Sequence, residues 1–149
     1  MVEPGLLERV LAGESQALGT DQPAVLAALT TSGRGVDVVI GPAGAGKTSM
    51  LRVAARAWYG AGHRVLGVTH TAVAADVLRR EAGIGAETVA KFLDWHDHDT
   101  TPHGWRLSAR HVVIVDEAGM VGTRDLDRLV TITQASGVKL VLVGDDRQL

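Results

Sequence analysis

The sequence predicts an α/β fold in which helices sandwich a parallel β-sheet. Short apolar runs rich in β-branched residues alternate with segments whose apolar residues recur at helical spacing. The first of these runs, at 36–40, leads into a glycine-rich loop at 41–48 that opens a helix. A later run, at 111–115, ends in two adjacent carboxylates. Strands separated by helices pair in parallel, and ligands bind at the carboxyl ends of such strands.

Residues 1–33 predict two short helices ahead of the sheet. In the first, aliphatic residues recur at helical spacing up to Gly13: Leu6, Leu7, Val10 and Leu11. The second begins after Asp21, a favourable N-cap, carries a proline in its first turn and ends at Gly33. We therefore divide the chain into an N-terminal helical segment, 1–33, and an α/β domain, 34–149.

The rest of the chain predicts four strands and four helices. The strands are expected at 36–40, 64–68, 111–115 and 138–143. Helices are expected at 49–59 and 87–95. Another follows 69–75 and runs through about 81, and the last is marked by Leu126, Leu129 and Val130 and closed at 136–137. A polar, irregular stretch at 96–110 separates the third helix from the next strand.

Composition bounds the class of protein. Hydrophobic residues make up 46% of the 149-residue chain and charged residues 21%, as in a globular domain. No stretch reaches the ~20 apolar residues that span a bilayer, and we find no secretory signal, so we expect a cytoplasmic protein without a membrane partner. The absence of cysteine excludes disulfides and thiolate metal sites. The net charge of −2 leaves nucleic-acid binding open.

The glycine-rich loop has the pattern G-x-x-x-x-G-K-T, which indicates a phosphate-binding loop (P-loop) of an NTPase. Its glycines allow backbone N–H groups to face an anion, and the following helix presents more of them. The ammonium group of Lys47 can reach the β- and γ-phosphates, and the hydroxyl of Thr48 suits Mg²⁺. An ordinary glycine-rich turn is the alternative, but it does not explain both flanks. The residues expected to bind the nucleotide are Gly41, Pro42, Ala43, Gly44, Ala45, Gly46, Lys47, Thr48 and Ser49.

The two carboxylates after the strand at 111–115 are expected to complete this site. Mg²⁺ held near Thr48 gives Asp116 a cation to bind. Glu117 is then placed to polarise an attacking water. Both acids can also be plain surface residues after a strand, but the glycine-rich loop upstream favours the functional interpretation.

Two other polar residues have a functional and a structural interpretation. The amide of Gln22 carries a donor and an acceptor, so it can pair with the edge of adenine, but it can equally be an exposed residue at a helix start. Thr71 follows the second strand, where ligands bind, but it can instead cap the next helix. Local spacing alone favours the structural interpretation for both.

The stretch that follows the third helix is rich in potential metal ligands: His96, Asp97, His98, Asp99 and His103. We expect a polar surface loop and no metal cluster, because ligands without supporting contacts are poorly oriented. Trp95 and Trp105 can stack on bases or pack this loop onto the domain.

Together, the motifs resemble the first RecA-like domain of a superfamily 1 DNA helicase. The nearest group contains the RecD-type helicases and the helicase part of conjugative relaxases of the TraA/MobF kind. The resemblance covers about 6–149. Its specific parts are the D-E-A-G-M box at 116–120 and the G-D-x-x-Q-L box at 144–149, since the Walker A loop fits many NTPases.

The resemblance implies an ATP-dependent 5′-to-3′ DNA helicase domain that uses ATP and Mg²⁺. It implies that Gln22 contacts adenine and that Gln148 senses the γ-phosphate. It also implies that Thr71 and Ala72 contact single-stranded DNA. The residues implied to act in catalysis are Lys47, Glu117 and Gln148.

In the family that the chain resembles, a second RecA-like domain supplies half of the DNA track and a catalytic arginine, which is worth ~10³–10⁵ in rate. The resemblance implies that this second domain is missing here. We therefore expect a fragment, truncated at its C-terminal end, that binds nucleotide with very low turnover. The last strand should insert between the first and the third, which leaves the strand at 36–40 at an exposed sheet edge. No DNA nicking is implied, because the only tyrosine, Tyr59, lies within a helix.

Two rival functions remain open at the level of sequence. A small-molecule or nucleotide kinase would need a lid with arginines, for which Arg79, Arg80 and Arg106 are candidates. A non-catalytic module with a decayed nucleotide site is disfavoured by the intact Lys47 and Asp116.

Overall fold

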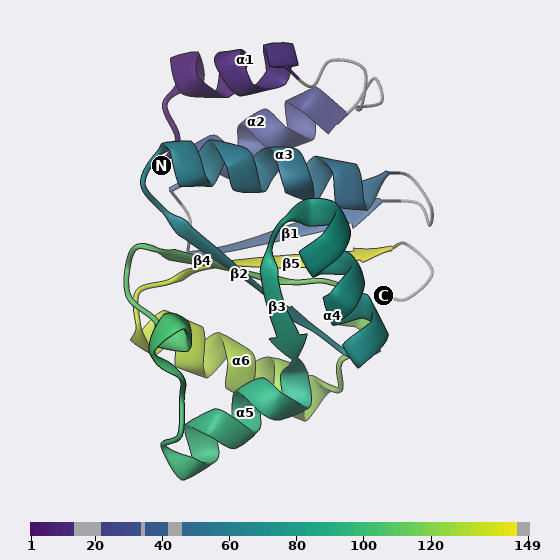
Figure 1. Ribbon diagram of the computed structural model, residues 1–149, viewed down its shortest axis with the longest axis vertical. Helices are drawn as coiled ribbons and strands as arrows, with labels where there is room; N and C mark the ends of the chain where they lie inside the picture. The colour runs from purple at the N-terminus through teal and green to yellow at the C-terminus, as the bar shows by residue number, and fades with distance from the viewer. Residues whose placement is uncertain (14–21, 34, 42–45, 146–149) are drawn as a thin grey trace.

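Five parallel strands lie between two layers of helices (Figure 1). The computed structural model describes residues 1–13, 22–33, 35–41 and 46–145. The sheet has the order β1-β5-β4-β2-β3. Its strands are β1 (Val36–Gly41), β2 (Arg64–Thr69), β3 (Gly85–Thr88), β4 (His111–Val115) and β5 (Lys139–Asp145).

The helices divide between the two faces of the sheet, which confirms the predicted fold class (Figure 1). One face carries α1 (Pro4–Gly13), α2 (Gln22–Thr31), α3 (Lys47–Gly60) and α4 (Ala72–Val77). A π-helical turn, Leu78–Ala82, continues α4. The other face carries α5 (Val89–His98) and α6 (Thr123–Ala135). None of the helices in the described ranges combines the length and the hydropathy that a membrane-spanning segment requires.

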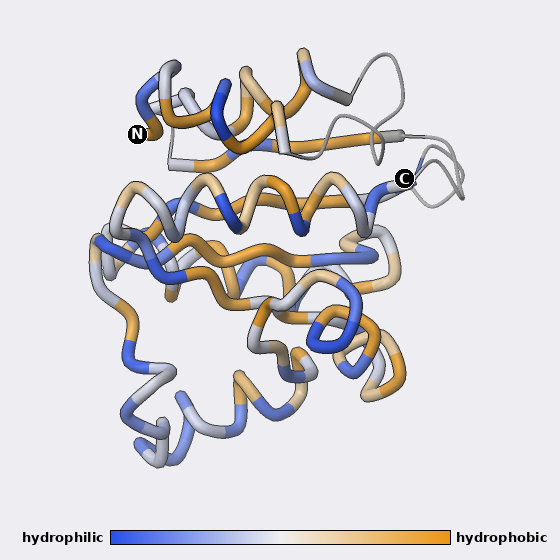
Figure 2. Tube along the Cα trace, turned by 45° about the horizontal axis from the view of Figure 1, so that its top comes forward, coloured by the Kyte–Doolittle hydropathy of each residue, from blue (hydrophilic) through white to orange (hydrophobic). Residues whose placement is uncertain are grey.

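Each helical layer packs on its own hydrophobic cluster. On the α3 face, the helices bury Leu7, Leu26 and Trp58 against alternate residues of the strands. On the α6 face, Phe92 and Leu129 pack against the intervening strand residues. Figure 2 shows predominantly hydrophobic strands between the two helical layers. Burial on both faces explains why these strands are continuous apolar runs and not alternating ones.

The strand order confirms the prediction that the last strand inserts next to the glycine loop. β5 pairs with β1 on one side, in the register Val39↔Val143, and with β4 on the other, in the register Val115↔Leu142. Among the described residues, β1 therefore lies at the edge of the sheet, as predicted. Two of its side chains, Val38 and Ile40, are 58% and 55% exposed.

The prediction of four strands was wrong, because β3 adds a fifth. The helix expected to start at residue 87 begins at Val89, after this strand. β3 packs closely against β2 at Gly67. A β-carbon at this position would lie 3.3 Å from both the Ala86 and the Ile84 side chains. Local sequence does not reveal such a close approach, because it depends on packing between distant segments.

Candidate nucleotide-binding site

The glycine loop lies between β1 and α3, as predicted. Gly41 ends β1, whereas Pro42, Ala43, Gly44 and Ala45 lie outside the described residues. Gly46 caps α3 with a φ of 75°, a left-handed conformation that favours glycine. Three predicted ligands then occupy the first turn of α3, all half-buried: Lys47, Thr48 and Ser49.

Asp116 lies directly after β4, at the carboxyl end of that strand. The glycine loop leaves β1 at the same end of the parallel sheet. Its backbone N–H donates to the carbonyl of Val68 at the end of β2, over 3.0 Å. Burial raises the pKa of the Asp116 carboxyl, whereas the amide of Glu117 and the positive charge of Lys47 act to lower it. Both groups lie at the carboxyl ends of the strands, Lys47 in the first turn of α3 and Asp116 directly after β4.

Glu117 has an unusual backbone conformation next to this carboxylate. Its φ is 53°, in the left-handed region that side chains with a β-carbon rarely adopt. Its N–H donates to Asp116 Oδ1 over 2.9 Å, and its carbonyl accepts from the Met120 amide over 2.9 Å. Strained conformations held in this way are common at functional sites.

Asp145 is a third acid at this edge, to which the sequence prediction gave no role. It ends β5, is 7% exposed and pairs in register with Gly41. The signal was available, because Asp145 belongs to the box at 144–149 and follows a buried strand.

Two predicted nucleotide contacts stay predictions. Gln148 lies outside the described residues. Gln22 is the first residue of α2, but its side chain is likewise outside the described part of the structure.

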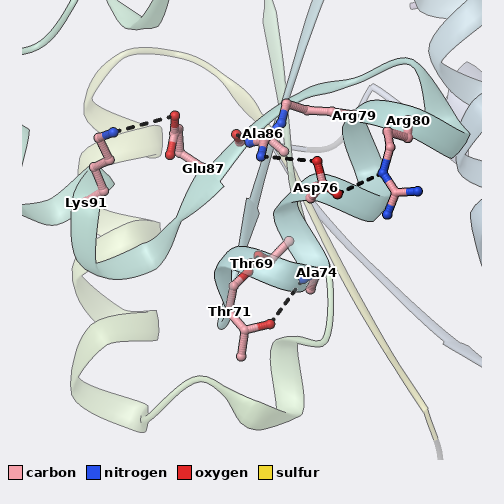
Figure 3. A network of polar contacts seen from close by, with 9 residues as sticks. All are labelled: Thr69, Thr71, Ala74, Asp76, Arg79, Arg80, Ala86, Glu87 and Lys91. Atoms are coloured by element: carbon pink, nitrogen blue, oxygen red, sulfur yellow. Dashed lines mark hydrogen bonds and ion pairs between the residues drawn. The ribbon is translucent and has the colours of Figure 1, made fainter.

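Thr71 and Ala72 lie at the N-terminus of α4, on the exposed surface. Figure 3 shows the Thr71 hydroxyl at the N–H of Ala74, from which it accepts a hydrogen bond of 3.1 Å. Thr71 is therefore a helix cap, as local spacing predicted. The buried hydroxyl of Thr69 donates to the Thr71 carbonyl over 2.7 Å and fixes this turn to the end of β2.

The candidate lid arginines do not form a lid. Arg79 and Arg80 both pair with Asp76 on the same helical segment, and Arg79 also donates to the Ala86 carbonyl of β3 (Figure 3). Arg106 lines a separate hollow between α5 and α6 on the other side of the sheet.

The loop after α5 packs through its tryptophans. The rings of Trp95 and Trp105 lie 5.4 Å apart, and Trp105 also contacts Phe92 edge-on. His98 pairs with Asp94 one turn earlier. Within the described ranges, no three histidine or acidic side chains are arranged to hold a metal ion.

The donor set at the sheet edge fits a nucleotide with Mg²⁺. The hydroxyl of Thr48 and the carboxylate of Asp116 are hard oxygen donors, the type that Mg²⁺ prefers. A half-buried carboxylate with a raised pKa gains most from a nearby cation. A parallel sheet with a phosphate loop, a lysine and an acid at one edge defines a P-loop NTPase domain.

Comparison with known sequences gives the family. The chain belongs to the AAA domain family, whose sequence profile matches residues 17–149. The chain is 41% identical over 115 residues to a probable conjugal transfer protein TraA of Sinorhizobium fredii, and 36% identical over 138 residues to the conjugal transfer protein TraA of Agrobacterium fabrum. It is also 36% identical over 154 residues to the multifunctional conjugation protein TraI of Escherichia coli.

These relatives confirm the resemblance to the TraA group. The three alignments cover 76%, 92% and 97% of this chain, but only 10%, 12% and 8% of the relatives. The chain thus spans about a tenth of the length of the curated relatives it matches.

Proposed function

We propose that this chain is the ATP-binding and ATP-hydrolysing domain of a DNA helicase. One observation carries the proposal: the α3 N-terminus, with Lys47, and the end of β4, with Asp116, lie at one edge of the sheet, within electrostatic reach of each other. Residues 69 positions apart in the sequence thus converge where a triphosphate could bind. A fold without this function has no need to hold a carboxylate half-buried there.

Each residue at this edge has a proposed role. The N–H groups of the first turn of α3 and the ammonium of Lys47 would bind the phosphates. Thr48 and Asp116 would hold Mg²⁺. When bound, Mg²⁺ would offset the charge that develops on the phosphate oxygens. Gln22 would contact adenine.

Hydrolysis and its coupling to DNA are proposed for three further residues. Glu117, fixed by its bond to Asp116, would orient the attacking water. Gln148 would sense the γ-phosphate. Thr71 and Ala72 would contact single-stranded DNA, because they lie exposed at the end of β2, two strands from β5.

A DNA substrate is part of the proposal and rests on the resemblance of the motifs to those of superfamily 1 helicases. The relatives are named conjugal transfer proteins, and this chain matches about a tenth of their length. We propose 5′-to-3′ movement along single-stranded DNA, in which a second domain supplies an arginine worth ~10³–10⁵ in rate. The 149-residue chain alone would therefore bind ATP and turn it over very slowly.

Binding of a fluorescent ATP analogue, with and without Mg²⁺, tests the proposal. We expect Mg²⁺-dependent binding that Lys47→Ala and Asp116→Asn each weaken at least about tenfold, by loss of a phosphate contact and a metal ligand. Lys91→Ala and Asp127→Asn, at exposed positions in α5 and α6, serve as matched controls and should bind as the parent chain does.

Equal binding by all four variants would show that nucleotide does not occupy this edge. ATPase activity of the chain, measured with and without single-stranded DNA, tests the proposed dependence on a second domain. Strong stimulation by DNA in this chain alone would contradict that dependence.

A further inference from the structure

A buried hydroxyl joins the end of β2 to the turn that precedes α4. Thr69 is the last residue of β2 and is fully buried. Its hydroxyl donates to the Thr71 carbonyl over 2.7 Å, and Figure 3 shows the two threonines side by side at the start of α4. Strands buried on both faces of a parallel sheet are usually apolar throughout, so a hydroxyl at this position calls for a physical reason.

Three hydrogen bonds hold Thr71 in place. Its carbonyl accepts from the Thr69 hydroxyl and also from the Ala75 N–H, over 3.0 Å, which begins the hydrogen-bond ladder of α4. Its own hydroxyl accepts from the Ala74 N–H. Of these three bonds, the one from Thr69 reaches beyond the turn and the helix, so it is the bond that fixes the start of α4 to the sheet.

The same end of β2 supports the proposed metal ligand. The carbonyl of Val68, one residue before Thr69, accepts from the Asp116 N–H over 3.0 Å. On its other side, Thr69 pairs in register with Thr88 of β3. The backbone is therefore held between two neighbouring strands, and this rigid end of β2 links Asp116 to the turn at Thr71.

We propose that Thr69 is a positioning residue for DNA binding. Its hydroxyl holds the exposed turn at Thr71 and Ala72 in one place relative to Asp116. The inference rests on the proposed contact of that turn with single-stranded DNA. Thr69 is buried, so it does not touch DNA and acts through the Thr71 carbonyl. A turn that is already fixed does not have to be ordered when DNA binds, which favours binding.

A hydroxyl that only stabilises the fold is the alternative, and Thr133 offers a matched comparison. Thr133 is also fully buried, and its hydroxyl donates to the Leu129 carbonyl over 2.8 Å. It lies in α6, on the opposite face of the sheet from α4. Thr133→Val therefore removes a comparable buried hydrogen bond without disturbing the turn before α4.

NMR titration of the labelled chain with a single-stranded oligothymidylate tests the proposal, because it detects the weak binding expected of half a DNA track. Thr69→Val keeps the shape of the side chain and removes the donor. It should weaken DNA binding about fivefold, the usual effect of losing one neutral hydrogen bond, and leave binding of the ATP analogue unchanged. Thr69→Ser should restore DNA binding, and Thr133→Val should bind DNA as the parent chain does.

Amide hydrogen exchange tests the positioning without any ligand. The amides of Ala74 and Ala75 should exchange about fivefold faster in Thr69→Val than in the parent chain, because the first turn of α4 opens more often. Thr133→Val should leave the exchange of these two amides unchanged.

The possible failures of this proposal are distinct from failure of the nucleotide site. Normal DNA binding or normal α4 exchange in Thr69→Val would overturn the role of Thr69. Equal loss of DNA binding in Thr133→Val would overturn it too, because lost stability would then explain the effect. A parent chain whose Thr71 and Ala72 signals do not respond to the oligothymidylate would refute the DNA contact itself. Each of these results would leave the binding of ATP and Mg²⁺ to be judged on its own.

Discussion

Asp116 illustrates how one residue can be costly to the fold and useful to the site. Burial raises the pKa of its carboxyl, so the charged form is destabilised in the folded chain. The amide of Glu117 and the ammonium of Lys47 reduce this cost without removing it. A buried group that the fold supports at a cost is a strong candidate for function.

Asp116→Asn should therefore make the chain more stable at neutral pH. The pKa of the Asp116 carboxyl is higher in the folded chain than its ordinary value of 3.8. Its contribution to the free energy of unfolding is therefore present below pH 3.8 and is lost as the pH rises through the raised pKa. The amide cannot ionise and can still accept from the Glu117 N–H. Urea unfolding should show the gain at pH 7, and the gain should shrink on acidification. A less stable variant at pH 7 would contradict this reasoning.

His111 should make stability fall in acid. The residue is 7% exposed, and its Nδ1 accepts from the Ser108 N–H over 3.1 Å, so the ring is neutral in the fold. Burial lowers its pKa, which means that the unfolded chain takes up a proton first. The contribution of His111 to the free energy of unfolding is therefore present above its ordinary pKa of 6.5 and is lost as the pH falls through its lowered pKa in the folded chain.

His111→Asn keeps an acceptor and removes the titration. Its free energy of unfolding should therefore depend less on pH between neutral pH and pH 5 than that of the parent chain. The matched control is His103→Asn at an exposed position. Equal pH profiles for the two variants would show that His111 contributes nothing to acid sensitivity.

At the scale of elements, two contacts fix how the strands pack, and Gly67 makes the first of them. Gly67→Ala would place a β-carbon 2.9 Å from Leu78 Cδ1 and 3.3 Å from the Ala86 side chain. We expect a loss of about 1–3 kcal/mol in unfolding free energy, as for other overpacked sites. Gly104→Ala, where a β-carbon meets nothing within 4 Å, should cost far less. Equal losses would contradict a tight contact between β2 and β3.

The second contact is the ion pair between Lys139 of β5 and Asp37 of β1. Their side chains are 2% and 12% exposed, and Lys139 also donates to the Ser32 carbonyl over 2.8 Å. Lys139→Met would leave Asp37 buried without this cation, at a cost of about 3–5 kcal/mol. Adding Asp37→Leu should recover much of that loss. A double variant no more stable than Lys139→Met alone would show that the pair does not act as a unit.

The elements differ in how well the sequence predicts them. β4 was predicted at its observed bounds, because its five buried residues include four consecutive apolar, β-branched ones and leave little ambiguity. β3 was missed because Gly85–Thr88 is short and lacks such a run. Its pairing depends on Gly67, a contact between distant segments that propensity does not encode.

At the scale of the whole molecule, the strand order brings the site together. β5 inserts between β1 and β4, so Gly41, Asp145 and Asp116 end adjacent strands on one edge. Motif spacing predicted that Gly41 and Asp116 belong to one site and gave Asp145 no role. The strand order itself came from the family resemblance, since neighbours in sequence would suggest a different sheet. The conformation of Glu117 could not be predicted, because a left-handed glutamate is exceptional.

The most direct test of this account uses Mn²⁺ in place of Mg²⁺, added with ATP to the isotopically labelled chain. Paramagnetic broadening in NMR spectra reports which amides lie near the metal ion. If the metal ion and the triphosphate bind between the start of α3 and the end of β4, the amide signals of Thr48 and Glu117 should broaden together. The amide signals of Ser108 and Gly137, which precede β4 and β5 at the opposite end of the strands, should stay sharp. Broadening at Thr48 without broadening at Glu117 would contradict the account.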